Sequence, residues 1–295
     1  MDEALENFDP GVWCCFTAEL EAPMPSAGMI VGPTDVMNLL EARRQLRKQG
    51  FHFGNPVPMD VFIHSVGESQ SRSQTKFGGL PYWPLHETWP CGSTGRPLPF
   101  VGQFDFRGSL DIVGESVEND LLLIFGALPS ADCDPEILLI WRSATNNEEL
   151  VTSADVPCSN AFGPFSCTRW RTSSYPDAEI EEYQDALFGD ENYIDPSYAC
   201  DLLATQIGMA PFTLAEKPPS LNKKYLCCCA PILPATDRRY PFLNFREPLL
   251  TIHGTNYLYA DRFNYVDQWS SLGDSTSLYF FRDKAGHLRS EMILG

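Results

Sequence analysis

The chain has 295 residues, 43% of them hydrophobic and 20% charged, a composition typical of a globular protein and not of a disordered or fibrous one. Its 39 acidic and 21 basic residues give a formal net charge of −18. That charge disfavours nucleic acid and anionic membranes as partners, because both are bound through cationic surfaces. No apolar run approaches the ~20 residues needed to cross a bilayer, so no membrane span is predicted.

The first 54 residues are predicted to form an acidic segment and one amphipathic helix that packs on the rest of the chain. Thr34 is a typical N-cap, and apolar residues recur at helical spacing until Gly50, a typical residue just beyond a helix C-terminus. The N-terminus is acidic where a secretory signal would be basic and then apolar, so we expect a cytoplasmic protein. The last turns carry cations that complement the helix dipole, namely Arg43, Arg44, Arg47 and Lys48.

The densest pattern runs from Thr75 to Phe106, where a loop rich in Gly, Pro and aromatic residues leads into an alternating strand. Glycine permits backbone angles closed to other residues and proline fixes φ, so we expect a rigid loop. In the strand, alternate side chains should lie on opposite faces. One face would hold Phe100, Gly102, Phe104 and Phe106, and the other Val101, Gln103 and Asp105.

The same criteria predict strands over residues 57–66, 120–125 and 136–142. An irregular region is predicted over 145–176, where any boundary between halves would fall. Two helices are expected next, one with an acidic outer face within 177–195 and one from Pro196 to about Gln206. The remaining chain is predicted to be mainly β, with strands over 224–232, 248–253 and 258–266 and a hairpin that joins 277–282 to 287–293.

An internal echo indicates a duplicated architecture. TKFGGLPY at Thr75 and TQIGMAPF at Thr205 share Thr, an apolar residue, Gly, Pro and an aromatic residue at matching offsets. We therefore predict an α+β fold of mainly antiparallel sheets with a few helices, formed by two related halves. The predicted units are an N-terminal segment over 1–54 and a domain over 55–295, with halves at 55–160 and 177–295.

The motifs KFGGLPYWP and LPFVGQFDF, followed by IGMAPF and WSSLGDSTSLYFF, resemble the YwqG-like family of bacterial proteins over roughly residues 55–295. The resemblance implies an α+β fold with internal duplication and brings no established catalytic mechanism. Some proteins of this kind are associated with polymorphic-toxin loci, which implies that some act as immunity proteins. Met209, Ala210 and Thr276 depart from the family pattern, which puts any shared ligand site at those positions in doubt.

No standard catalytic or metal-binding motif is present. The sequence contains no G-x-S-x-G, P-loop, G-x-G-x-x-G or H-E-x-x-H, its five histidines show no paired spacing, and its cysteines form no C-x-x-C pair. We therefore predict no catalytic residue, no metal site and no cofactor. The ten cysteines are expected to be reduced and to pack as small apolar residues.

Two surfaces remain as candidates. The loop residues could line a ligand cleft, although the aromatic residues among them could equally be packing, and His86-Glu87 could be an acid–base pair or simply face water. These residues are Tyr82, Trp83, His86, Glu87 and Trp89.

The other surface is the stretch 177–195, which holds eight acidic residues and no basic ones. It could be a solvated helix face or a surface that steers a cationic partner. Toxins that act on nucleotides or nucleic acids have cationic clefts, so an acidic protein can occlude them without chemistry. The candidate toxin-binding residues are Asp177, Glu179, Glu181, Glu182, Asp185, Asp190 and Glu191.

The leading hypothesis is a non-enzymatic cytoplasmic immunity protein that binds a basic protein partner, a secreted antibacterial toxin domain, and blocks its active site. The alternative is an enzyme or small-ligand-binding protein that uses the cleft near the 75–106 loop. Charge reversal in 177–195 should impair only the first activity, and replacement of His86 only the second.

Overall fold

The computed structural model describes residues 29–30, 33–114, 119–127, 136–145, 148–158, 164–176, 178, 180, 196–200, 203–208, 224–229 and 277–293. The strands predicted over 248–253 and 258–266, and nearly all of the predicted acidic helix, lie outside these residues. None of the described helices is both long enough and apolar enough to cross a membrane.

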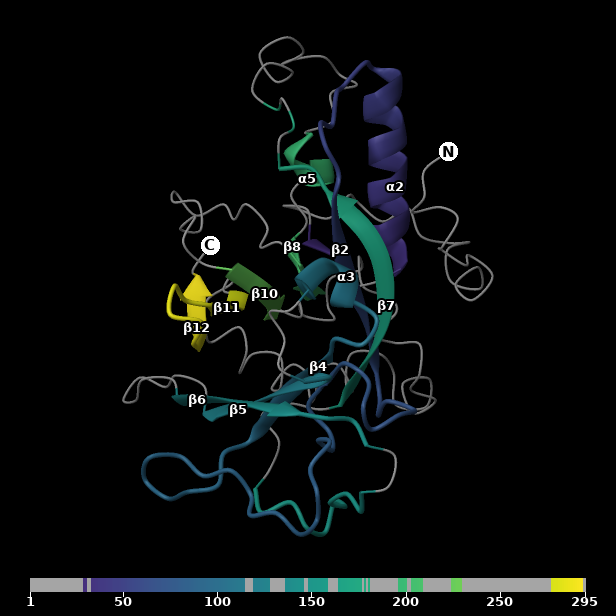
Figure 1. Cartoon of the computed structure of the whole chain (residues 1–295). Helices are drawn as coiled ribbons and strands as arrows, with labels where there is room; N and C mark the ends of the chain where they lie inside the picture. The colour runs from purple at the N-terminus through teal and green to yellow at the C-terminus, as the bar shows by residue number, and fades with distance from the viewer. Residues whose placement is uncertain are drawn as a thin grey trace, which may run out of the picture.

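Within the described residues, ten strands form one antiparallel sheet (Figure 1). From one end to the other they are β12 (Leu288–Ile293), β11 (Ser277–Arg282), β10 (Lys224–Cys229), β9 (Gln206–Ile207), β2 (Val57–Val66), β7 (Phe165–Ser174), β3 (Lys76–Phe77), β4 (Phe100–Asp105), β5 (Leu121–Ala127) and β6 (Glu136–Arg142). The other elements are the parallel pair β1 (Met29–Ile30) and β8 (Leu203–Ala204), and the helices α2 (Pro33–Lys48), α3 (Leu110–Val113) and α5 (Ser197–Cys200).

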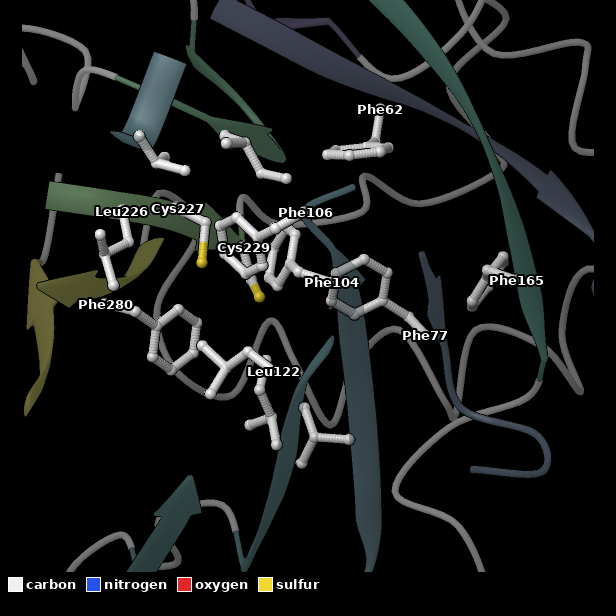
Figure 2. Close-up of a cluster of buried hydrophobic side chains, with 14 residues drawn as sticks. Phe62, Phe77, Phe104, Phe106, Leu122, Phe165, Leu226, Cys227, Cys229 and Phe280 are labelled. Atoms are coloured by element: carbon white, nitrogen blue, oxygen red, sulfur yellow. The ribbon is translucent and has the colours of Figure 1, made fainter. Parts of the chain in front are cut away.

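The sheet curls until it is nearly closed, because both of its end strands contribute to one inner core. Trp141 of β6 and Leu288 of β12 pack against the same buried cluster. Figure 2 shows this cluster, in which Phe62 of β2, Phe77 of β3 and Phe280 of β11 converge with side chains of the intervening strands. The prediction of mainly antiparallel sheets with a few helices is thus confirmed, while internal duplication stays a prediction.

The two longest strands, β2 and β7, form the middle of the sheet. They pair from Val57–Ser174 to Val66–Phe165 without a break in register. Outward from this pair the strand order runs alike in both directions: a two-residue strand and then three consecutive strands, β9 to β12 on one side and β3 to β6 on the other. The two copies of the sequence echo supply the two short strands β3 and β9.

Helix α2 lies along β2 and β7 and buries a second core against their outer face (Figure 1). Leu39 and Leu46 of the helix meet Val61 of β2 and Trp170 of β7 there. Gly50 has φ of 86°, as expected of a residue just beyond a helix C-terminus. The expected helix is confirmed.

One of its cations has a role that helix-dipole reasoning did not predict. Arg43 is buried, and its guanidinium donates to the carbonyl oxygen of Ala199, to Thr172 Oγ1 and to the carbonyl oxygen of Ser173 at 3.0, 3.0 and 2.6 Å. It therefore joins α2 to α5 and β7.

Three local predictions were wrong. The region 145–176 was expected to be irregular, yet it contains β7, whose inner face carries Arg169 and Arg171 as well as Phe165 and Cys167. The helix from Pro196 to Gln206 ends at Cys200 and gives way to β8 and β9, because that segment pairs with β1, β2 and β10.

The face assignment of the strand at 100–106 was right for Phe104 and Phe106, which share the inner face, but wrong for Phe100 and Val101. A register shift between Phe100 and Gly102 turns Val101 into the inner core with Phe104 and Phe106, while Phe100 faces the opposite side. A bulge of this kind inserts one residue into a strand and so reverses the alternation beyond it.

Candidate functional site

The loop between β3 and β4 covers the outer face of β4 and β5 with aromatic side chains. Tyr82 and Trp83 are each 4% exposed, and both belong to a third core with Phe100 and Phe125. The Trp83 and Phe125 rings lie 5.4 Å apart in an edge-on arrangement, and Trp89 contacts both. These three aromatic residues therefore contribute packing, which is one of the two roles that the sequence left open.

Glu87 is held in an ion pair. Its carboxylate accepts hydrogen bonds from the guanidinium of Arg142, whose Cζ lies 4.2 Å from the centre of the Trp83 ring. Hydrogen bonding from Arg142 lowers the pKa of Glu87, which keeps it ionised and makes it a weak proton acceptor. His86 is exposed, so the pair His86-Glu87 does not form a shared buried site.

The beginning of the loop is fixed by Gln103 of β4. The Gln103 Oε1 accepts from the backbone N–H of Tyr82 at 2.9 Å, and its Nε2 donates to the carbonyl oxygens of Arg72 and Gln74 at 2.7 and 2.9 Å. Thr75 Oγ1 accepts from the backbone N–H of Asp105 at 2.9 Å. Side chains of β4 and of Thr75 thus satisfy backbone groups on both sides of β3 and at the end of β4.

Lys76, between Thr75 and Phe77, is a buried cation without a hydrogen bond. Its side chain is 1% exposed, and among the described residues its Nζ has no hydrogen-bond partner. The nearest carboxylate oxygen is Glu68 Oε2, 3.9 Å away. Burial lowers the pKa of Lys76 to about 8, and the charge of Glu68 opposes that shift.

A second polar cluster lies on the inner face of β2 and β7. The Asp60 carboxylate is fully buried and accepts from Arg171 Nε and from Ser109 Oγ, each at 2.5 Å. Arg171 also donates to Asp111 beside it, and these hydrogen bonds raise the pKa of Arg171. The cluster ties α3 to the central strands.

The cysteines of the described residues are all free thiols. Cys167, Cys227, Cys228 and Cys229 have pKa values raised by burial, as expected of thiols that pack as apolar groups. No group of three or more His, Cys, Asp or Glu side chains in the described residues is placed to hold a metal ion.

The acidic candidates cannot be placed on this framework. Asp177, Glu179, Glu181, Glu182, Asp185, Asp190 and Glu191 all lie outside the described residues. Sequence reasoning did not single out Lys76, Glu68 or Asp60. A lysine in a two-residue strand and a glutamate in a polar loop carry no periodic signal that would mark them as partners.

A family model described as "Domain of unknown function (DUF1963)" matches residues 75–127. This segment contains β3, β4 and β5, the aromatic loop, Lys76 and Gln103. The chain is thus similar to DUF1963 proteins over its central segment, and the description of that family assigns no activity. A search of curated proteins found no match.

Proposed function

We propose that the protein acts by binding a basic protein partner and not by catalysis, as an immunity protein that blocks the active site of an antibacterial toxin. One observation carries the proposal. The chain has a net charge of −18, and the stretch 177–195 holds eight acidic residues and no basic ones.

A stretch of concentrated negative charge suits a protein that binds a cationic surface. The described residues also contain carboxylates that are paired with arginines, as in Asp60–Arg171 and Glu87–Arg142. An unbalanced acidic segment raises the association rate with a cationic partner by roughly 10- to 1,000-fold at low ionic strength. It also fixes the orientation of the complex, because like charges repel in other arrangements. The toxin class follows from the YwqG-like resemblance.

The alternative, an enzyme or ligand-binding protein that uses the loop at 75–106, has less support. Tyr82 and Trp83 are packed in a core, and the Glu87 carboxylate is occupied by Arg142. A stacking platform requires exposed ring faces, and a general base requires a free carboxylate.

The test begins with capture of partners by the tagged full-length chain from its own organism, at low and high salt. We expect one basic protein in near-equal amount that is toxic to cells unless this chain is co-expressed. A chain that is recovered alone, or a partner whose toxicity it does not relieve, would overturn the proposal.

The sequence offers a matched pair for mapping the interface. Glu181-Glu182 lies in the acidic segment, and Glu148-Glu149 is an exposed pair in the described part. Glu181→Lys with Glu182→Lys should weaken binding to the partner strongly, and more so at low salt. Glu148→Lys with Glu149→Lys makes the same change in net charge and should have a much smaller effect. Equal losses would show that only total charge matters.

We further infer that the two halves of the sheet arose by duplication, with β2 to β6 matched by β7 and β9 to β12. The order of the strands supports this, and so does a repeated hydrogen bond: Gly78 N–H donates to the Val101 carbonyl oxygen at 2.8 Å, and Gly208 N–H to that of Leu226 at 3.0 Å. A crystal structure tests the inference. The two strand sets should superpose by a rotation of about 180°, the operation of a two-fold axis, between β2 and β7.

A further inference from the structure

The surroundings of Lys76 contain more positive than negative charge. Glu68 is the nearest carboxylate, and Arg72 is close enough for its charge to help lower the pKa of Lys76. The Arg72 side chain donates to the carbonyl oxygens of Pro81 and Val151, which are neutral. Two cations thus face one carboxylate at a buried position, where an unbalanced charge is unfavourable.

The Glu68 carboxylate occupies a position shaped to receive it. Its Oε1 accepts a hydrogen bond from the backbone N–H of Leu80 at 3.0 Å. It also lies directly against Gly79, where a Cβ atom would come within 2.2 Å of Oε1. Gly79 has φ of 69° and no Cβ, so the loop leaves room for a carboxylate beside the Leu80 N–H.

Glu68 fills this position only in part. Its Oε2 stays 3.9 Å from Lys76 Nζ, which is an ion contact but longer than a hydrogen bond. The Glu68 side chain is 43% exposed, whereas Lys76 behind it is 1% exposed. The Glu68 carboxylate therefore covers the Lys76 ammonium group. Solvent can reach the carboxylate but not the ammonium group.

We propose that Lys76 Nζ, the space beside Gly79 and the Leu80 N–H form a binding site for a small organic carboxylate, whose place the Glu68 side chain takes in this structure. We call it the Lys76 site. A free carboxylate is not tethered to the loop, so it can accept from Leu80 N–H and Lys76 Nζ together. It would supply the hydrogen bond that Lys76 lacks and neutralise the second cation.

The site requires a lysine that remains charged at neutral pH. With a pKa of about 8, Lys76 is mostly protonated at pH 7 and mostly neutral at pH 9. Carboxylate binding should therefore weaken as pH rises through 8. The matching position in the other half of the sheet is Gln206 of β9, which has no charge. Only the first of the two positions is therefore a site for an anion.

Acetate is the probe, and the full-length ¹⁵N-labelled chain is titrated with it at pH 7 under constant ionic strength set by chloride. The Leu80 amide resonance should shift and saturate in the wild-type protein. In Glu68→Ala the apparent affinity should increase about tenfold, because the competing side chain no longer reduces the fraction of open sites. In Lys76→Met the saturable shift should disappear.

The Lys76→Met variant is expected to fold, since methionine suits a buried position. Its ¹⁵N-correlation spectrum will show whether it is folded. Glu68→Gln provides a second test, because it removes the competing charge at nearly the same size and should also bind acetate more tightly than the wild type. A Leu80 resonance that does not saturate in the wild type, or that responds alike in Lys76→Met, would overturn the proposal. Inorganic phosphate run in parallel should bind more weakly; tighter binding would reject a carboxylate as the ligand class.

The Lys76 site does not depend on the proposed toxin binding. Loss of acetate binding leaves the partner experiment untouched, and failure to capture a partner leaves the titration untouched.

Discussion

Asp60 and Arg171 form an ion pair on the inner face of the sheet, with Arg171 Nε 2.5 Å from Asp60 Oδ1 and the carboxylate fully buried. The same guanidinium reaches Asp111, whose side chain is 62% exposed. One arginine is thus paired with a buried and an exposed carboxylate, and the two can be compared directly.

Asp60→Ala should destabilise the protein by about 3 kcal/mol, because it leaves Arg171 and Ser109 without their buried acceptor. Asp111→Ala should cost less than about 1 kcal/mol, as expected of an exposed ion pair. Urea unfolding of both variants measures the two values. Similar losses would mean that the exposed Asp111 stabilises Arg171 as much as the buried Asp60 does.

Lys76→Met should stabilise the protein at neutral pH. Because the folded pKa is about 8 against 10.5 for an ordinary lysine, protonated Lys76 opposes folding by about 3 kcal/mol below pH 8. Between pH 8 and 10.5 the unfolded chain holds a proton that the folded chain has released, so wild-type stability should rise with pH in that window.

The measurement is the difference in unfolding free energy between Lys76→Met and wild type at pH 7 and pH 10. Buried thiols act in the opposite direction above pH 9, because the unfolded chain releases their protons, but they are the same in both proteins and cancel. We expect the advantage of the variant to shrink at pH 10. A constant difference would show that Lys76 keeps its ordinary pKa.

Gly79→Ala should cost more than Gly95→Ala. Both glycines have positive φ, 69° and 76°, which disfavours alanine by about 1–2 kcal/mol. A Cβ at Gly95 meets nothing within 4 Å, whereas one at Gly79 collides with Glu68. In a Glu68→Ala background the cost of Gly79→Ala should fall to that of Gly95→Ala. If the background does not alter it, the carboxylate does not lie against Gly79.

Native-state alkylation should separate the cysteines by burial. Cys91 is exposed and should react first, while Cys227, Cys228 and Cys229 should react only after unfolding, because burial both shields them and raises their pKa values. Peptide mass spectrometry after a timed pulse of iodoacetamide reads each site. Rapid labelling of Cys227 or Cys229 would indicate that the inner core opens easily.

Much of the sheet could be predicted from local pattern. Strand β2 and the hairpin of β11 and β12 were predicted because their apolar residues alternate between turn-forming segments. Strand β7 was not, because Arg169 and Arg171 occupy its inner face, and their partner Asp60 is far away in the sequence, 111 residues from Arg171. From the sequence alone, a charged residue at a core-facing position is assigned to the solvent face, because its partner is not known.

The candidate site shows the same limit. The aromatic loop could be recognised from its composition, and packing was one of its two predicted roles. The Lys76 site could not, since Glu68 and Gly79 lie before and after the short strand that holds Lys76. The chain on both sides of that strand is held in place by Gln103 of the next strand. Contacts that depend on tertiary structure carry no sequence period.

The placement of β3 and β9 has a consequence for how the chain can be divided. Strand β3 is separated from β2 by β7, and β9 pairs with β2, so each half of the sheet is completed by a strand from the other half. A fragment that ends at residue 160 would leave β2 and β3 with bare edges, which are prone to aggregation. The strands of the two halves therefore alternate at the middle of the sheet. During synthesis, β2 and β3 cannot join one sheet until the ribosome has made β7, which lies between them.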